Sequence, residues 1–163
     1  MASATYLQSL DSVYEDGTSR GVTPSNRRQI ETFIAKETIA IGDWVAFDVG
    51  ATADGDVTLG VYKADSNSVP IRPAVGVALH AATAAEDKIE VCISGVCNAS
   101  VGDNGGAGNA IGTPLETTGT AGTADAAGIG AASTGQPACG ILAETVPGAA
   151  GITIKRVIVR KSF

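Results

Sequence analysis

The chain has few of the side chains that build most active sites and aromatic-lined ligand pockets. Its 163 residues include one histidine, three cysteines and 4% aromatic residues, and only 17% of its residues are charged. No apolar run approaches the roughly 18 residues of a membrane-spanning helix, and residues 1–10 lack the basic and apolar regions of a signal peptide. We therefore expect a soluble protein made in the cytoplasm, with no membrane contact.

The residues present do not assemble into a catalytic set. Gly17–Gly21 reads G-T-S-R-G, the pattern of a nucleophile elbow. That motif requires a strand before it, a helix after it and a histidine within reach. Here it lies in a polar segment, and His80, the single histidine, follows an expected strand without an obvious partner. We interpret His80 as a surface residue and expect no enzymatic activity.

The candidate metal ligands are also better explained as structural residues. The cysteines form no CxxC pair and are expected to be reduced, small apolar residues: Cys92, Cys97 and Cys139. Four polar residues lie at expected turns: Asp54, Asp56, Asp103 and Asn104. Such side chains commonly bond nearby backbone amides, and the spacing of a calcium loop is missing. We expect no metal and no cofactor.

Charge is distributed unevenly along the chain. Residues 1–30 sum to zero, residues 31–151 carry −10, and residues 152–163 carry +4. Binding nucleic acid requires a basic face that neutralises phosphates. The acidic body therefore predicts no nucleic-acid partner, and the short basic end is typical of a solvated or inter-subunit edge.

Three motifs occur twice, in the same order: an Ile-Gly step, a Pro-Ala-x-Gly stretch and an Ile-x-apolar stretch. The first copies are Ile41-Gly42, Pro73–Leu79 and Ile89–Val91, and the second copies are Ile111-Gly112, Pro137–Ala143 and Ile152–Ile154. The shared order and spacing indicate an internal duplication with pseudo-repeats at about 39–101 and 109–163. Each copy is expected to bury its apolar face against the other.

The apolar spacing predicts an all-β body over residues 29–163. Alternation of period two predicts strands at 30–35, 44–49, 57–62, 74–79, around 89–93, 114–118, 123–127 and near the C-terminus. No long segment has the 3.6-residue period of a helix. In 74–79, the small residues Ala74, Gly76 and Ala78 share one face, which lets a neighbouring strand or subunit approach closely.

The last apolar segment is apolar on both faces. Val157, Ile158 and Val159 follow each other without a polar residue between them. This predicts either a bulge near Lys155-Arg156 or a strand covered on both sides. All three residues are therefore candidates for a contact with another subunit or partner.

Residues 1–28 have the composition of an extended N-terminal arm. Polar residues dominate, and the isolated apolar anchors Tyr6, Leu7, Leu10 and Tyr14 cannot form a core by themselves. We expect a partner to order this arm, with these four anchors as candidate contact residues.

From Ile39 onward, the sequence resembles the capsid decoration, or cement, proteins of tailed phages. The motifs that carry the resemblance are Ile41-Gly42-Asp43, Val75–Ala78, Ile89–Val91 with Gly95-Val96, and the second copies Ile111-Gly112, Cys139–Ile141 and Ile152–Ile154. Thr113-Pro114 departs from the pattern, because a second Gly-Asp would be expected there.

The resemblance implies a compact β-barrel or β-tulip built from two related halves. It also implies a homotrimer on the outer capsid surface of a virion assembled in the host cytoplasm. The protein would contact the major capsid protein and stabilise contacts between capsomers. A phage tail- or fibre-associated adhesion module that recognises host glycans is the alternative, although aromatic residues are few. A trimeric β-fold hydrolase is a third reading, which the missing catalytic set disfavours.

Overall fold

Every regular element of the described chain is a β-strand. The computed structural model describes residues 28–48, 59–67, 74–127 and 138–160. The strands are β1 (Gln29–Ala35), β2 (Trp44–Phe47), β3 (Gly60–Lys63), β4 (Ala74–Ala78), β5 (Lys88–Val101), β6 (Pro114–Thr117), β7 (Ala124–Ala126), β8 (Gly140–Leu142) and β9 (Thr153–Val159). The predicted all-β class is confirmed. The described residues contain no helix of a length and apolarity that would cross a membrane.

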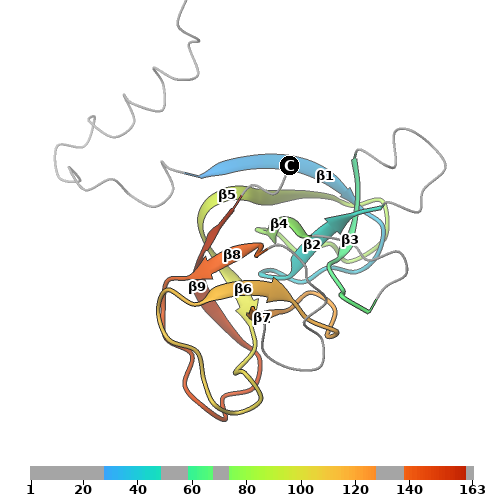
Figure 1. The fold of residues 1–163 in the computed structure, drawn as a ribbon. Helices are drawn as coiled ribbons and strands as arrows, with labels where there is room; N and C mark the ends of the chain where they lie inside the picture. Colours follow the sequence, from blue (N-terminus) through green and yellow to red (C-terminus); the bar gives the residue numbers. More distant parts are fainter. Residues whose placement is uncertain (1–27, 49–58, 68–73, 128–137, 161–163) are drawn as a thin grey trace, which may run out of the picture.

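The strands close into two rings that have the same strand order (Figure 1). The first ring, here called barrel 1, runs β1-β3-β2-β4-β5 and closes through the β1–β5 pair. The second, barrel 2, runs β5-β7-β6-β8-β9 and closes through β5–β9. Each ring has one parallel pair, β1 with β3 in barrel 1 and β5 with β7 in barrel 2. All other pairs are antiparallel. The predicted β-barrel is confirmed, and ring closure leaves few free strand edges.

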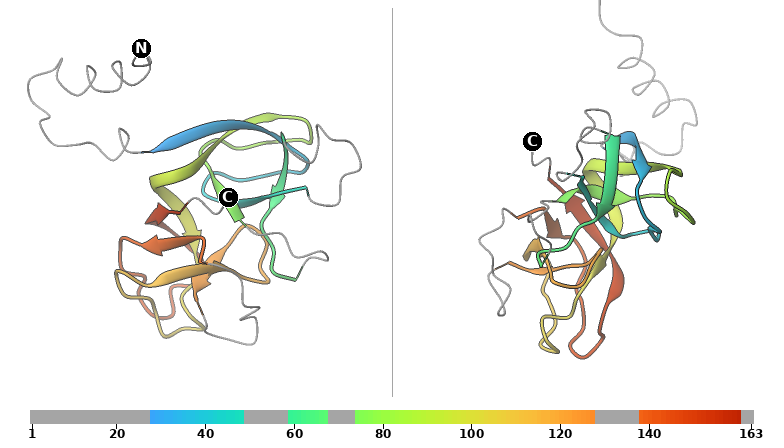
Figure 2. Two further views of the ribbon diagram at one scale, coloured as in Figure 1. Left: turned by 45° about the horizontal axis from the view of Figure 1, so that its top comes forward. Right: turned by 90° about the vertical axis from the view of Figure 1, so that its right-hand side faces the viewer.

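Strand β5 belongs to both barrels. Its first half pairs with β1 and β4, and its second half, from Gly95 to Val101, pairs with β9. Gly95 has a φ of 104°, in a region that favours glycine because it lacks a Cβ atom. The pairing with β1 also shifts register between Gln29 and Ile30. These irregularities lie where β5 passes from barrel 1 to barrel 2 (Figure 2).

The duplicated glycines occupy equivalent positions in the two barrels. Gly42 and Gly112 both have a φ of 89°, in turns closed by hydrogen bonds from Asp43 N to Ala40 O and from Thr113 N to Ala110 O. A type II turn requires a positive φ at this position. The barrel that contains each turn also has a glycine in its fourth strand: Gly76 at the centre of β4 and Gly140 at the start of β8.

The small-residue face of β4 serves a contact inside the chain. A Cβ atom on Gly76 would lie 2.4 Å from the carbonyl oxygen of Cys92 on β5. Ala74 and Ala78 are buried as well. The suggestion that this face meets another subunit is therefore wrong, and the alternative, close approach of a neighbouring strand, is what the structure has.

Strand pairing corrects the alignment of the last duplicated motif. Ala78 lies opposite Val91 in barrel 1, and Leu142 lies opposite Val157 in barrel 2. Val91 is therefore equivalent to Val157, three residues beyond the Ile154 that the motif comparison matched to it. The connection between the fourth and fifth strands is longer in barrel 2, which accounts for the difference. The Ile152–Ile154 stretch has the same apolar spacing as Ile89–Val91 and was therefore matched to it.

The interiors of the two barrels differ in volume at equivalent positions. Phe33 and Phe47 fill barrel 1, with their rings 5.8 Å apart in an edge-to-face arrangement. By strand register, the same positions in barrel 2 hold Ala99 and Thr117. Barrel 2 therefore has less side-chain volume of its own at this level.

Trp44, a residue of barrel 1, packs into barrel 2. Its side chain is fully buried in one cluster with Leu115, Leu142 and Val157. The indole Nε1 donates a hydrogen bond to Ser100 O at 3.1 Å. Its ring approaches Gly140 so closely that a Cβ atom there would be 2.9 Å from Cη2. The indole thus packs where barrel 2 has small residues.

The carboxylate of Asp43, beside Trp44, lies at the junction between the barrels. Its Oδ2 accepts a hydrogen bond from Ala40 N at 2.9 Å, and its Cγ would be 2.8 Å from a Cβ atom on Gly122. Burial raises the pKa of this carboxyl above its ordinary value, and the Ala40 hydrogen bond lowers it only in part.

We expect Trp44→Ala to lower the free energy of unfolding by about 3–5 kcal/mol, the usual cost of removing a buried tryptophan. Trp44→Phe should cost less because it keeps most of the apolar volume. Urea denaturation measures both. Ile152→Ala is the control, since Ile152 is 56% exposed and should change stability little. A Trp44→Ala loss no larger than that of the control would contradict a structural link between the barrels.

Asp43→Asn should make the protein more stable at pH 7 and leave its stability unchanged near pH 3. The folded state raises the pKa of Asp43, so the ionised carboxylate opposes folding at neutral pH. This cost disappears as the pH falls below the unfolded value, where both states hold the proton. Thermal melts across this pH range test the expectation. Asp43→Ala, which also removes the acceptor for Ala40 N, should be destabilising; equal losses from both variants would refute the assigned cause.

Candidate interaction surface

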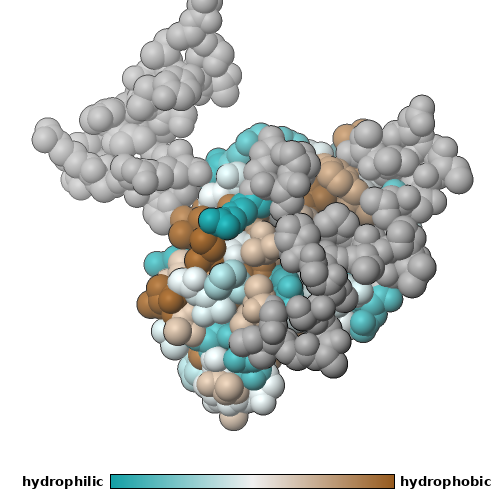
Figure 3. Space-filling model, viewed as in Figure 1, coloured by the Kyte–Doolittle hydropathy of each residue, from teal (hydrophilic) through white to brown (hydrophobic). Residues whose placement is uncertain are grey.

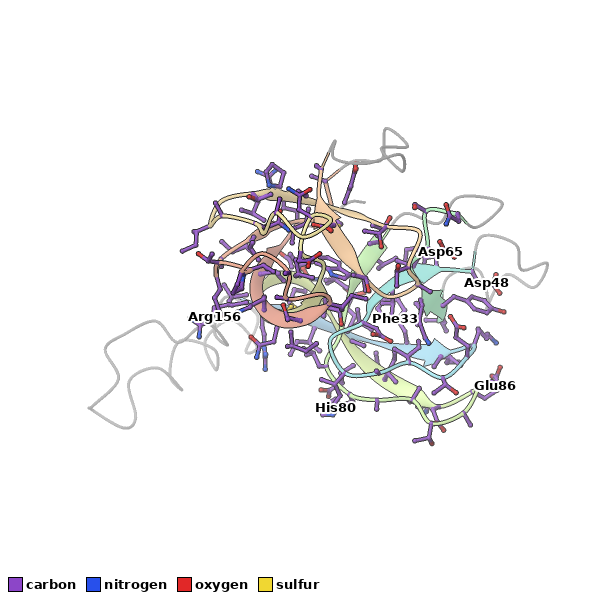
Figure 4. The ribbon with its side chains drawn as sticks, turned by 90° about the horizontal axis from the view of Figure 1, so that it is seen from below. Phe33, Asp48, Asp65, His80, Glu86 and Arg156 are labelled. Carbon is purple, nitrogen blue, oxygen red and sulfur yellow. The ribbon has the colours of Figure 1, made fainter. Side chains whose placement is uncertain are left out.

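The one histidine forms an exposed ion pair. His80 Nε2 lies 2.9 Å from Glu90 Oε2, and the two side chains are 63% and 52% exposed. Figure 4 shows His80 at the periphery of the body, whereas Phe33 lies inside it. The expectation of a surface residue after a strand is met, but the expectation that His80 has no partner is wrong. Glu90 lies ten residues later in the chain, on β5. The two side chains meet only because of the register between β4 and β5, which the sequence alone does not show.

The acidic turn residues of barrel 2 hold loops together. Asp125 Oδ2 accepts a hydrogen bond from Asn104 N at 3.0 Å, and Asp125 Oδ1 accepts one from Asn109 Nδ2 at 2.7 Å. Asp103 accepts from Gly106 N and Gly151 N. Within the described ranges, no three His, Cys, Asp or Glu side chains gather as a metal site. Asp54, Asp56 and Gly17–Gly21 lie outside those ranges.

The cysteines are buried and unpaired as disulfides. Burial raises the pKa of the Cys139 thiol to about 12. A hydrogen bond with Cys92, together with burial, raises the pKa of Cys97 well above the ordinary thiol value. The same hydrogen bond lowers the pKa of Cys92. The raised pKa values keep Cys97 and Cys139 protonated and inert at neutral pH, which agrees with their interpretation as small apolar residues.

Strand β9 has one buried face and one exposed apolar face. It pairs with β5 from Thr153 to Val159 without a register shift, so the expected bulge near Lys155-Arg156 is absent from this pairing. Val157 and Val159 face the interior of barrel 2 and are buried, whereas Ile158 is 41% exposed. The doubly apolar pattern therefore reflects an apolar outer face that the described chain leaves uncovered.

Ile158 lies in a row of outward-facing apolar residues that crosses four strands. Pro114 on β6 pairs with Ile141 on β8, Ile141 pairs with Ile158, and Ile158 pairs with Val96 on β5. We call Pro114, Ile141, Ile158 and Val96 the open row. All four are exposed or half-buried. Figure 3 shows hydrophobic surface in the region of β8 and β9.

Barrel 1 has an equivalent row that is covered. Trp44 pairs with Val77, Val77 with Cys92, and Cys92 with Ile30. The first three are fully buried, in the same cluster as the core residues of barrel 2. We call these four residues the covered row. Ile30, at the end of this row, is 38% exposed. The same outward face is therefore mostly buried in barrel 1 and exposed or half-buried in barrel 2.

A shallow cleft of about 470 Å³ borders the open row at Val96. The other residues that line it are Arg28, Cys97, Asn98 and Arg156. Arg28 Nε is buried there without a hydrogen-bond partner among the described residues. Arg156 lies on the outer face of β9 at the edge of the body (Figure 4). The cleft thus gathers two cations beside an apolar strip on a protein that is acidic over most of its length.

The sequence pattern predicted only part of this surface. Of the predicted contact residues, Ile158 is on it, Val157 and Val159 are in the core, and Tyr6, Leu7, Leu10 and Tyr14 lie outside the described residues. It missed Pro114, Ile141 and Val96, which become neighbours of Ile158 only through strand register. Ile141 follows the second Pro-Ala-x-Gly motif and could be recognised in the sequence. The sequence did not show that its side chain faces outward.

The architecture is that of a closed β-barrel protein with a second, topologically matching ring. It is similar to the N base of the head fiber protein gp8.5 of bacteriophage phi29. The TM-score is 0.53 at 15% sequence identity, over 83% of this chain and 96% of that chain. At this identity the likeness shows a shared fold. No protein-family model matches the chain, and no curated protein matches its sequence.

We expect Asp125→Ala to lower the free energy of unfolding by about 1–3 kcal/mol, because Asn104 N loses its acceptor and Asn109 Nδ2 keeps only its hydrogen bond to Gly102 O. His80→Ala should cost at most about 1 kcal/mol, as is usual for an exposed ion pair. Thermal and urea denaturation measure both. EDTA should leave the melting temperature of the unmodified protein unchanged; a large drop on chelation would show that the acidic loops hold a metal ion.

Proposed function

We propose that this chain is a head-associated protein of a tailed phage that decorates the outer capsid surface. In this proposal it acts as a homotrimer, contacts the major capsid protein and stabilises contacts between capsomers. The observation that carries the proposal is the fold likeness to the N base of a phage head fiber protein, over 96% of that chain. The motif resemblance to decoration proteins supports the same assignment.

The distribution of charge supports a position outside the shell. Residues 31–151 carry −10, and an acidic body is repelled by the phosphates that fill a packaged head. The basic residues of β9 and Arg28 leave one side of barrel 2 without this repulsion. Among the described residues, the body also exposes isoleucines, including Ile111, Ile154 and Ile158, and apolar surfaces of this kind suit protein contacts.

Attachment to the fibre apparatus is the second candidate, because the similar structure is the base of a fiber. In that case the chain would join a fibre to the head instead of cementing capsomers. Glycan binding by the barrels is less well supported. The described aromatic residues are all buried or half-buried: Phe33, Trp44, Phe47 and Tyr62. An exposed aromatic platform, the usual surface for stacking a sugar ring, is thus missing from the described chain.

The N-terminal arm is proposed to help hold the body to the shell or to a neighbouring subunit. Burial of each anchor on a partner would contribute roughly 1.5–3 kcal/mol, less the cost of ordering the arm. We expect replacement of all four anchors by serine to leave the melting temperature unchanged and to lower occupancy on capsids assembled without the protein. The anchors are Tyr6, Leu7, Leu10 and Tyr14.

A matched control replaces four polar residues of the same arm by alanine: Ser3, Ser9, Ser12 and Thr18. Electron microscopy of decorated particles measures occupancy. Full occupancy of the serine variant would place the attachment in the barrels. If the unmodified protein fails to bind capsids, the decoration function is rejected. Density at one end of each fibre, with none between capsomers, would favour the fibre-base alternative.

A further inference from the structure

We propose that the open row of barrel 2 is the surface through which copies of this chain associate with one another. The proposal names the subunit contact of the homotrimer in the proposed function, and on that point it rests on the proposed function. It starts from one comparison inside the molecule: three of the four residues of the covered row of barrel 1 are fully buried, in one cluster with core residues of barrel 2, whereas nothing in the described chain covers the open row.

The turn beside each row shows the same difference. Gly42 O accepts a hydrogen bond from Ser100 N of barrel 2 at 2.8 Å, and a Cβ atom on Gly42 would be 2.7 Å from Ile154 Cδ1. A Cβ atom on the equivalent Gly112 would meet nothing within 4 Å, and its neighbour Ile111 is 66% exposed. Barrel 2 therefore exposes a whole docking face, made of a row and a turn.

The open row is apolar although no described residue of the chain packs over it. Isoleucines stand at the positions equivalent to Val77 and Cys92, so the row is at least as apolar as its covered counterpart. Exposed apolar surface that runs continuously across several strands is typical of an interaction site, whereas single exposed residues are not. The cations of the bordering cleft give it a polar rim, as protein interfaces commonly have.

The contact cannot repeat the way barrel 1 docks on barrel 2. Pro114 occupies the position of Trp44, so no indole is available to insert. The position in barrel 1 that would receive it is filled by Phe33 and Phe47. A head-to-tail chain of barrels is therefore disfavoured. The open row instead meets the open rows of other copies around a symmetry axis, which closes the assembly.

The charge distribution leaves this face open to a second copy. Each copy carries a net charge of −6, so copies repel one another at long range. Neither the open row nor the lining of the cleft contains a carboxylate, so a contact through the row does not bring carboxylates of two copies together, and the two cations lie beside the row rather than in it. Salt screens the long-range repulsion, so association should tighten as salt is added, the opposite of an interface held by ion pairs.

The test is sedimentation velocity of the full chain, without capsids, from low micromolar to submillimolar concentration. The unmodified protein should form a discrete oligomer, and Ile158→Arg should raise its dissociation constant at least about tenfold. Ile141→Arg should do the same, with a smaller effect because it is less exposed. The matched control is Ile41→Arg, an isoleucine 61% exposed on barrel 1, which should leave assembly intact. Circular dichroism and melting temperature verify that each variant is folded.

Several outcomes would overturn the proposal. One is a monomeric unmodified protein over the whole range. Another is an Ile158→Arg variant that assembles normally, even if it binds capsids less well, because the row would then belong to the shell contact. A third is assembly that survives both row variants and is lost when residues 1–27 are removed from the full chain. Because capsids are absent, failure of the decoration function would leave these results unaffected.

Discussion

The structure depends on how barrel 2 completes its core. Strand β5 supplies one strand to each barrel, so neither ring closes without it. Barrel 1 fills its own interior with Phe33 and Phe47, but barrel 2 has Ala99 and Thr117 at these positions and takes the indole of Trp44 instead. The dependence runs one way: barrel 2 requires a side chain from barrel 1, whereas barrel 1 is filled by its own residues. Two related rings thus behave as one folding unit.

The difference between Trp44 in barrel 1 and Pro114 at the equivalent position in barrel 2 explains why one outward face is covered and the other is open. Trp44 in the first barrel buries its row and the adjoining turn under the second barrel. Pro114, at the same position, has no ring of that size and lies exposed at the start of β6. If both positions held tryptophan, each barrel would present an insert for another, and the chain could extend without limit. Proline ends the series after two barrels and leaves an apolar face without an insert.

Local sequence patterns predicted the strands and turns because their causes are local. Alternation of period two predicted most strands, and the Ile-Gly steps predicted turns that need positive φ at Gly42 and Gly112. Register could not be predicted in the same way. The match of Ile89–Val91 to Ile152–Ile154 was three residues out, and the outward direction of Ile158 was invisible. The open row, the His80–Glu90 pair and the insertion of Trp44 all join residues that are distant in sequence, so only the closed rings reveal them.

The place where the described chain begins connects the two proposed contacts. Arg28, the first described residue, lines the cleft that borders the open row at Val96, so the point to which residues 1–27 are joined lies beside this row. If copies meet through their open rows, their N-terminal segments start close together, next to the shared axis. Arms linked in this way bind a common partner with a high effective concentration, and weak individual contacts then add up to firm attachment. Subunit association at the row and shell binding by the arms would therefore be thermodynamically coupled, although they use different residues.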